Sequence, residues 1–134
     1  MKKLDVKTER SLISEARKAA AKAYSPFSKV EVGAAILTSD GQVFSGCNVE
    51  NSSYGLSICA ERTAAVKAVS AGSRSFSAVA VVSNLEELTY PCGACRQFLS
   101  EFGIDMIVIV ASGKGEVTHH RLEELLPKAF RLEK

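Results

Sequence analysis

Three cysteines and one glutamate have the types and spacing of residues in a metal-assisted hydrolase. Glu61 follows Cys59 by two positions, and Cys92 and Cys95 stand three residues apart. Three thiolates bind zinc and leave its fourth tetrahedral position open for water, as in catalytic rather than structural sites. A water activated in this way needs a proton acceptor. The four residues therefore predict a catalytic zinc centre in which Glu61 carries protons and is not a ligand.

Two arginines are expected to tune this centre. Three thiolates overcompensate a divalent cation, which makes a bound water harder to ionise. Arg62 lies within one helical turn of Cys59, so we expect it to donate hydrogen bonds to the ligand sulfurs. Arg96 is the second candidate, for which a plain surface position is an equal alternative.

Helix starts must position the cysteines. Ser57 predicts the cap of a helix over 58–71, and Pro91 predicts the start of another over 92–102, and a glycine follows each. The unpaired amides and the dipole at such starts favour thiolates over thiols. The polar, irregular stretch 46–57 predicts a loop, where binding residues concentrate.

The other elements complete a layered domain. Strands that alternate with helices predict one α/β domain over 1–134, with helices on both faces of a sheet whose first two strands are antiparallel and whose later strands are parallel. The pattern predicts a helix over 8–24 capped by Thr8, a hairpin over 30–44, strands over 77–83 and 106–111, and a short helix over 121–126.

Composition narrows the classes of partner. With 134 residues, 46% of them hydrophobic and 24% charged, the chain has the balance of an ordinary globular protein. A formal net charge of +2 gives no reason to expect nucleic acid or a membrane surface as a partner. No apolar run approaches the length of a spanning helix, and the N-terminal stretch does not resemble a signal peptide. With four cysteines, this predicts the reducing cytoplasm.

Five motifs in register resemble those of the small cytidine deaminases, over nearly the whole length of the chain. They include the Cys-x-Glu and Pro-Cys-x-x-Cys signature of zinc deaminases. The motifs are Tyr-Ser-Pro-Phe-Ser at 24–28, Gly-Cys-Asn-Val-Glu-Asn at 46–51, Tyr-Gly-Leu at 54–56, Cys-Ala-Glu-Arg at 59–62 and Pro-Cys-Gly-Ala-Cys-Arg-Gln at 91–97.

The resemblance implies a fold and an activity. The fold is a three-layer α/β sandwich with a mixed sheet of about five strands and helices on both faces. The activity is the hydrolytic deamination of cytidine and 2′-deoxycytidine to uridine and 2′-deoxyuridine in pyrimidine salvage, with one Zn²⁺ per chain. Family members of this size are usually homotetramers with shared active sites.

The resemblance also implies substrate contacts. Asn48 and Glu50 correspond to residues that hold the ribose hydroxyls, and Phe27 to an aromatic residue that contacts the pyrimidine. The peptide group of Ala60 is a place where the polar edge of the base could be read, beside the Cys92 thiolate. Two further aromatic residues are implied at subunit boundaries: Tyr54, and Phe130, which would close a neighbour's pocket.

Other functions stay open at this point. A deaminase of an antibiotic cytosine nucleoside would share the zinc centre, although the segment 48–51 fits a free ribose. An editing enzyme for polynucleotides would need basic patches or stacking aromatics along a channel. A zinc-stabilised binding module would leave Glu61 idle.

Other roles for the ligand-type residues also stay open. Cys47 could close a structural four-cysteine zinc site, although a small buried residue near a strand end is the more common role. Cys92 and Cys95 could form a redox pair, but the usual strand and aromatic context is missing. His119 and His120 are expected to be surface or strand-end residues and not metal ligands.

Overall fold

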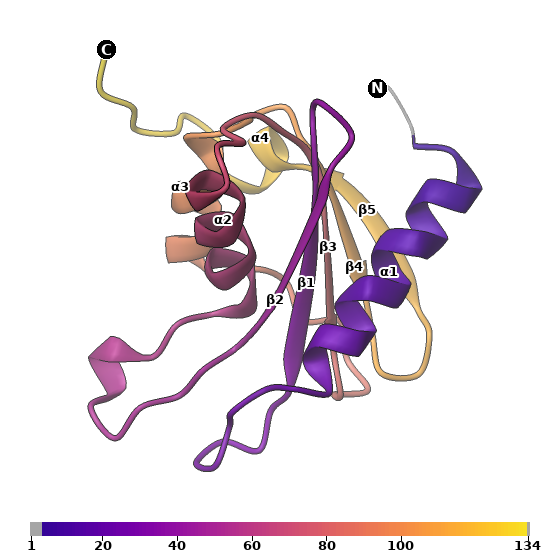
Figure 1. The fold of residues 1–134 in the computed structure, drawn as a ribbon, viewed down its shortest axis with the longest axis vertical. Coiled ribbons are helices and arrows are strands. Elements are labelled where there is room, and N and C mark those ends of the chain that lie inside the picture. Colours follow the sequence, from indigo (N-terminus) through magenta and orange to yellow (C-terminus); the bar gives the residue numbers. More distant parts are fainter. Residues whose placement is uncertain (1–3, 134) are drawn as a thin grey trace.

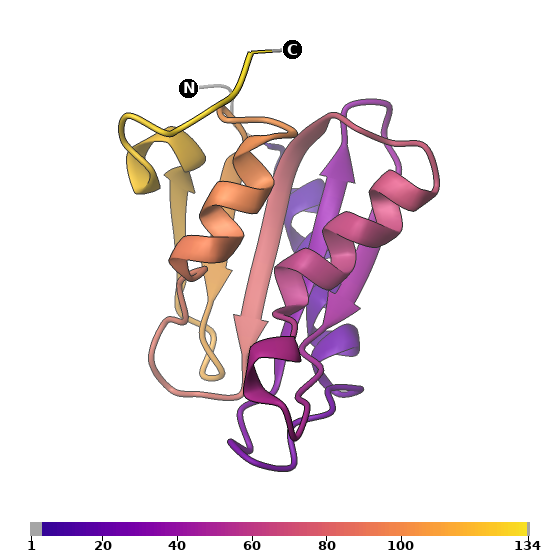
Figure 2. The ribbon, with the colours of Figure 1, turned by 90° about the vertical axis from the view of Figure 1, so that its left-hand side faces the viewer.

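The computed structural model describes residues 4–133, which form a mixed β-sheet covered by helices on both faces (Figures 1 and 2). The helices are α1 (Val6–Ala20), the 3₁₀ turn η1 (Tyr54–Leu56), α2 (Ala60–Ser70), α3 (Gly93–Ser100) and α4 (Leu122–Leu125). The strands are β1 (Val32–Thr38), β2 (Val43–Cys47), β3 (Phe76–Ser83), β4 (Ile107–Ala111) and β5 (Val117–Arg121). Within the described chain, no helix has the length and hydropathy that crossing a bilayer demands.

The strands run in the order β2-β1-β3-β4-β5. β1 is antiparallel to both β2 and β3, β3 and β4 are parallel, and β5 is antiparallel to β4. The three-layer α/β fold with a mixed sheet of five strands is thus confirmed, and so is the parallel pairing of the later strands β3 and β4, but the antiparallel edge strand β5 was not expected. The sequence pattern missed this strand because Val-Thr-His-His-Arg has no apolar run, and an edge strand can keep polar side chains.

Two cores fill the spaces between the layers. On one face α1 buries Ala16 in a cluster with Ile109 of β4. On the other face Ala64 of α2 and Leu99 of α3 share a cluster with Val81 of β3. Figure 2 views the sheet from the side of α2 and α3. Because both faces are covered, β3 and β4 are continuous apolar runs rather than alternating ones.

A glycine lets α2 approach β2 closely. A Cβ atom at Gly46 would lie 2.5 Å from the backbone nitrogen of Ala64. Real side chains do not tolerate such a distance, so glycine is required unless the helix moves away. This contact fixes the height of α2 above the sheet, and with it the position of the helix start that follows Cys59.

Two expected helix starts are corrected. α1 begins earlier, because Asp5 is its N-cap and its Oδ1 accepts from the Thr8 N–H at 2.7 Å. α2 begins later, at Ala60, with Cys59 rather than Ser57 as N-cap. The reason is that Ile58 is held in an extended conformation by backbone hydrogen bonds to Val49.

Two of the expected helices also extend too far at their C-terminal ends. α1 stops at Ala20 rather than continuing to 24, and α3 stops at Ser100 rather than 102. The residues after α1 form other backbone hydrogen bonds, since the backbone of Tyr24 pairs with Asn48 and Glu50. Helical periodicity does not reveal such competing pairings.

Candidate active site

A short backbone ladder joins three segments that carry predicted site residues. Tyr24 bonds to the main chain of Asn48 and Glu50 at 3.0 and 2.8 Å. Between those two residues, Val49 exchanges a pair of 2.9 Å hydrogen bonds with Ile58. Since Ile58 directly precedes the first metal-type cysteine, the ladder fixes the predicted ribose-binding segment against the predicted metal site.

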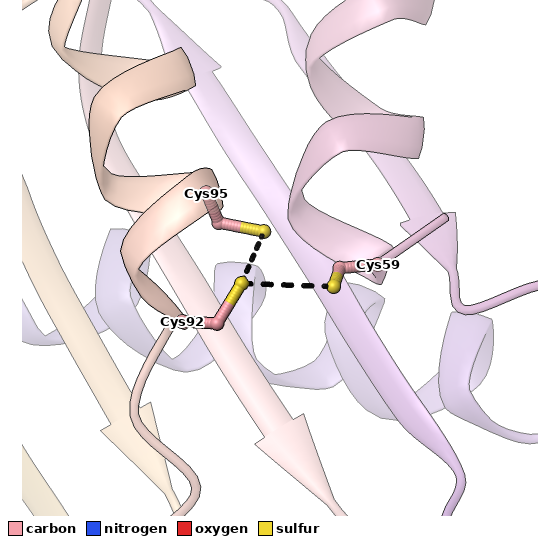
Figure 3. Close-up of side chains that lie close together, drawn as sticks. All are labelled: Cys59, Cys92 and Cys95. Atoms are coloured by element: carbon pink, nitrogen blue, oxygen red, sulfur yellow. Dashed lines mark hydrogen bonds between the residues drawn. The ribbon is translucent and has the colours of Figure 1, made fainter. Parts of the chain in front are cut away.

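Three sulfur atoms meet between the N-terminal ends of α2 and α3, as Figure 3 shows. The Sγ atom of Cys92 lies 3.5 Å from that of Cys95 and 3.9 Å from that of Cys59. All three ligand atoms lie within 4.8 Å of one another. Zinc–sulfur bonds of about 2.3 Å in a tetrahedral arrangement separate the sulfurs by about 3.8 Å. The observed spacing therefore fits a single metal ion.

Helix starts surround this thiol cluster, as expected. Cys59 and Cys92 are the N-caps of α2 and α3, and Cys95 lies in the first turn of α3. The hydrogen bond with Cys95, aided by Arg62 and Cys92, holds the pKa of Cys59 at about 5. The same hydrogen bond and burial raise the pKa of Cys95. A cluster that already holds one thiolate at neutral pH is suited to a cation, because thiolates are the metal-binding form.

Glu61 lies beside the cluster in the first turn of α2 and is only 4% exposed. Burial is the main cause that raises the pKa of its carboxyl to about 7, and the negative charge on Cys59 adds to the rise. A carboxyl with this pKa can both take up and release a proton near neutral pH. Glu61 therefore has the protonation behaviour of a general acid and base.

The two arginines have different partners. Nη2 of Arg62 donates to Sγ of Cys59 at 3.6 Å, which is the expected contact with a ligand sulfur. Arg96 instead donates from Nε to Pro91 O at 2.7 Å and from Nη1 to Leu125 O at 2.9 Å. The predicted sulfur contact of Arg96 is therefore corrected. Two carbonyl oxygens, one of them on the last residue of α4, engage its guanidinium in place of a sulfur.

A hollow of about 370 Å³ lies next to the ladder. Its lining includes Phe27, Glu50 and Tyr54, three residues predicted to contact substrate, together with Ser28 and Ser57. The rings of Phe27 and Tyr54 meet edge to face with centroids 5.9 Å apart. The structure thus brings together residues that are separated by 27 positions in the chain.

The Glu50 carboxylate faces this hollow as an ion. Its Oε1 accepts from the Phe27 N–H at 2.9 Å and the Ser28 N–H at 3.2 Å, and its Oε2 accepts from the Ser28 hydroxyl. These bonds, the one from the hydroxyl above all, lower the pKa of Glu50. No role was predicted for Ser28, although it belongs to the 24–28 motif, because nothing in the sequence pairs it with a residue so far along the chain.

Asn48 is held rigidly by the main chain. Its Oδ1 accepts from the Val32 N–H and its Nδ2 donates to Val30 O, both at 2.8 Å. An amide keeps one further donor and one further acceptor site after two such bonds. Ala60 is fully buried as the first residue of α2.

Phe130 lies apart from the hollow of its own chain. It belongs to the segment after α4, its backbone oxygen accepts from Gln97 Nε2 at 2.9 Å, and its residue surface is 68% exposed. Tyr54 lines the hollow but is 75% exposed. Both aromatic residues therefore face outward from this chain.

Other ligand-type residues lie outside the thiol cluster. Within residues 4–133, the group placed to share a metal ion consists of Cys59, Cys92 and Cys95. Cys47 is half-buried rather than buried, and its Sγ contacts Lys22 O at 3.6 Å. On β5, His119 pairs with Glu9 of α1, and His120 bonds to the Thr118 hydroxyl.

Comparisons with known proteins agree with this geometry. Residues 6–111 match the zinc-binding region of the cytidine and deoxycytidylate deaminases. A cytidine deaminase from Sporosarcina psychrophila is 51% identical over 120 residues, which are 89% of this chain and 88% of that protein. A crystal structure of cytidine deaminase from Burkholderia pseudomallei has a TM-score of 0.87 and 48% identity, covering 90% of this chain and 98% of that chain.

A more distant relative extends the comparison. Blasticidin-S deaminase from Bacillus cereus is 31% identical over 110 residues, which are 76% of this chain and 78% of that protein. The family match covers both the thiol cluster and the segment with Asn48 and Glu50. The chain belongs to the cytidine and deoxycytidylate deaminase family.

Proposed function

We propose that this protein is an enzyme that hydrolytically deaminates cytidine and 2′-deoxycytidine to uridine and 2′-deoxyuridine, within pyrimidine salvage. The observation that carries the proposal is the buried Glu61 carboxyl, with its pKa near 7, beside three thiols spaced for one metal ion. Relatives at 51% and 48% identity bear the name of this activity.

The proposed metal is one Zn²⁺ per chain, held by Cys59, Cys92 and Cys95. Thiolates are ligands that zinc prefers, and three of them leave a position for water. When bound, the ion supplies a Lewis acid that lowers the pKa of that water. Arg62 offsets part of the negative charge of the cluster through its hydrogen bond to Cys59.

Glu61 is the proposed proton carrier. Its carboxylate takes a proton from the water that attacks C4 and delivers it to N3 of the ring. It then takes the second proton from the new hydroxyl on C4 and gives it to the amine, which leaves as ammonia. A pKa of about 7 keeps both of its protonation states accessible through this cycle. Because the side chain is buried, bulk water does not compete for the proton.

Substrate recognition is assigned to the residues around the hollow and the ladder. Glu50 accepts a hydrogen bond from a ribose hydroxyl, and Asn48 uses its remaining donor and acceptor sites on the sugar. Phe27 contacts the pyrimidine ring. We assign the polar edge of the base to the Ala60 peptide group and the Cys92 thiolate.

A homotetramer with shared active sites is the proposed assembly. Tyr54 and Phe130 are largely exposed, and so are the neighbouring apolar residues Leu56 and Leu132. Large exposed apolar side chains in groups mark interaction surfaces. In this assembly, Phe130 of one chain closes the pocket of another, and Tyr54 lies where the chains meet.

We further propose that residues 1–134 act as one catalytic domain in the cytoplasm. All four cysteines are unpaired thiols. Three of them must stay reduced to hold the metal, and the cytoplasm provides that condition.

A second candidate function is the deamination of an antibiotic cytosine nucleoside. The 31% identity to Blasticidin-S deaminase favours it, whereas relatives at higher identity are named for cytidine. The Glu50 carboxylate and the Asn48 amide suit the hydroxyls of a free ribose, which supports cytidine as the substrate.

A spectrophotometric assay tests the proposal. Purified protein is mixed with cytidine, 2′-deoxycytidine, blasticidin S, cytidine monophosphate or a short cytosine-containing oligonucleotide, and the fall in cytosine absorbance is followed. We expect turnover of the two free nucleosides, lost by at least about a hundredfold in Glu61→Gln at unchanged metal content. Preference for blasticidin S or the oligonucleotide, or no turnover by the metal-loaded wild type, would refute the proposed substrate.

A further inference from the structure

The turn that carries Phe27 closes around the Glu50 carboxylate. Three donors of the turn converge on this group: the backbone N–H groups of Phe27 and Ser28, which share Oε1, and the Ser28 hydroxyl, which binds Oε2. Both oxygens of the carboxylate therefore accept hydrogen bonds from the same turn. A carboxylate offers about four acceptor sites, so one site remains for a further donor.

The Ser28 hydroxyl is itself fixed. Its oxygen accepts from the Val30 N–H at 3.0 Å while its hydrogen is directed to Glu50. The turn is closed by the Lys29 N–H, which donates to Ser25 O at 3.0 Å, and Lys29 has a left-handed φ of 64°. A lysine in this conformation costs free energy, which the surrounding hydrogen bonds must offset.

The bonds define the orientation of Glu50. The two backbone donors bind one oxygen and leave the carboxylate free to rotate about that contact, whereas the hydroxyl on the second oxygen stops the rotation. Glu50 and Ser28 both line the hollow next to Phe27. The one free acceptor site of Glu50 is therefore held toward the space that the sugar is proposed to occupy.

We propose that Ser28 is a positioning residue that orients the Glu50 carboxylate toward a sugar hydroxyl and so sets the preference for hydroxylated over dideoxy sugars. The inference rests on the proposed function, because it assumes that a cytosine nucleoside enters the hollow. Ser28 acts through Glu50 and need not touch the substrate. The lowered pKa of Glu50, caused first by the Ser28 hydroxyl, agrees with an acceptor that stays ionised.

A merely structural Ser28 would behave differently. If the hydroxyl only held the turn together, its loss would displace Phe27 and weaken every cytosine nucleoside alike. If the Ser28 hydroxyl orients Glu50, its removal weakens the binding only of substrates that carry the sugar hydroxyl. Ser28 is exposed and lies outside both cores, so a variant that removes only the hydroxyl keeps the fold.

The test compares cytidine with 2′,3′-dideoxycytidine in metal-loaded protein. For Ser28→Ala we expect KM for cytidine to rise about tenfold with kcat changed less than about threefold, since a hydrogen bond to a charged group is worth about this much. KM for the dideoxy substrate should change less than about twofold. Ser28→Thr, which keeps a hydroxyl, should restore the wild-type preference, and Ser52→Ala in the adjacent loop is the matched control.

A double variant gives an independent readout. In a Glu50→Gln background, the change Ser28→Ala should add less than about twofold to KM for cytidine, because both changes remove the same contact. Equal losses on both substrates, an unchanged preference, or full additivity would each overturn the role of Ser28. These outcomes differ from failure of the proposed function, in which the wild type itself turns over neither nucleoside.

Discussion

Glu61 and Arg62 are neighbours in the sequence, and the Cys59 thiolate raises the pKa of both, which favours a neutral carboxyl and a charged guanidinium. The thiolate adds to the burial that raises the pKa of Glu61, so it helps to keep a proton on the carboxyl. The same sulfur accepts a hydrogen bond from Arg62 and raises the pKa of the guanidinium. One sulfur atom therefore favours the protonated form of two side chains in the first turn of α2.

The raised pKa of Glu61 predicts a pH-dependent stability. Between pH 4.5 and about 7 the folded chain binds a proton at Glu61 more tightly than the unfolded chain, so this contribution to stability is lost as pH rises through that window. Glu61→Gln should gain stability relative to the wild type by at most about 3 kcal/mol. A bound cation reduces the gain, because it favours the carboxylate.

Denaturant unfolding of both proteins at about pH 5 and about pH 8, with equal metal content, measures this difference. The unfolding free energies should diverge in favour of the glutamine variant at the higher pH. A difference that stays constant over this range would contradict the assignment of a raised pKa to Glu61.

Arg62 is predicted to support metal retention. Arg62→Gln removes the hydrogen bond to Sγ of Cys59, and we expect a loss of metal affinity of about tenfold together with lower turnover. Competition with a chelator, read by metal analysis, measures the affinity. Cys47→Ala is the control, since its sulfur lies outside the cluster and its metal content should match the wild type. Wild-type affinity in Arg62→Gln would remove this role.

The metal-type residues were predictable because their types and spacing match a known metal-binding signature, and the structure brings the three sulfurs together. The contacts of Arg96 and Ser28 were not predictable. Arg96 binds a carbonyl oxygen 29 positions away, and Ser28 binds a carboxylate 22 positions away. Such partners depend on how loops return to one another, which no local pattern reports.

At the scale of elements, α2 depends on its contact with β2. Gly46 lies where the strand touches the helix backbone, and α2 carries Glu61 in its first turn. Any change that lifts α2 from the sheet must also move that turn relative to α3. Packing of these two elements and the geometry of the thiol cluster are therefore coupled.

Gly46→Ala is expected to reduce both stability and metal affinity. The added methyl group would lie 2.5 Å from Ala64 N, and such overpacking typically costs about 1–3 kcal/mol. Gly93→Ala, where a Cβ meets no atom within 4 Å, is the matched control and should change stability by less than about 1 kcal/mol. Thermal unfolding and chelator competition measure both effects. Equal behaviour of the two variants would show that α2 can shift without harm.

Elements with strong apolar periodicity were predictable and the others were not. β3 and β4 stand out as buried runs, whereas β5 is a polar edge strand whose existence depends on its neighbour β4. The start of α2 was misplaced because Ile58 pairs with Val49 across a loop. Long-range backbone pairing overrides local capping signals in such places.

At the scale of the whole molecule, the exposure of Tyr54 and Phe130 supports the proposed homotetramer with shared active sites. Phe130 is held on the outer side of α3 through the Gln97 hydrogen bond to its backbone, with its ring outward. A shared active site predicts complementation between chains. Phe130→Ala should lower kcat/KM by about tenfold and leave metal content unchanged.

Co-expression of Phe130→Ala with Glu61→Gln tests this sharing. Mixed assemblies contain some sites that have both Glu61 and a neighbour's Phe130, so activity per wild-type Glu61 chain should exceed that of Phe130→Ala alone. Light scattering checks that the mixed protein has the mass of a tetramer. Activity equal to that of the separate variants would place Phe130 in its own chain's function or in none.

The backbone ladder around Val49 determines which substitutions this site can accept during evolution. Peptide groups supply all four of its hydrogen bonds. Replacing one β-compatible side chain by another at 49 or 58 therefore leaves the spacing between the segment 48–50 and the thiol cluster unchanged. Proline, which has no N–H, is the exception at either position. Under the proposed function, single substitutions at 28, 48 or 50 are therefore expected to change sugar recognition while the ladder stays in place beside the thiol cluster.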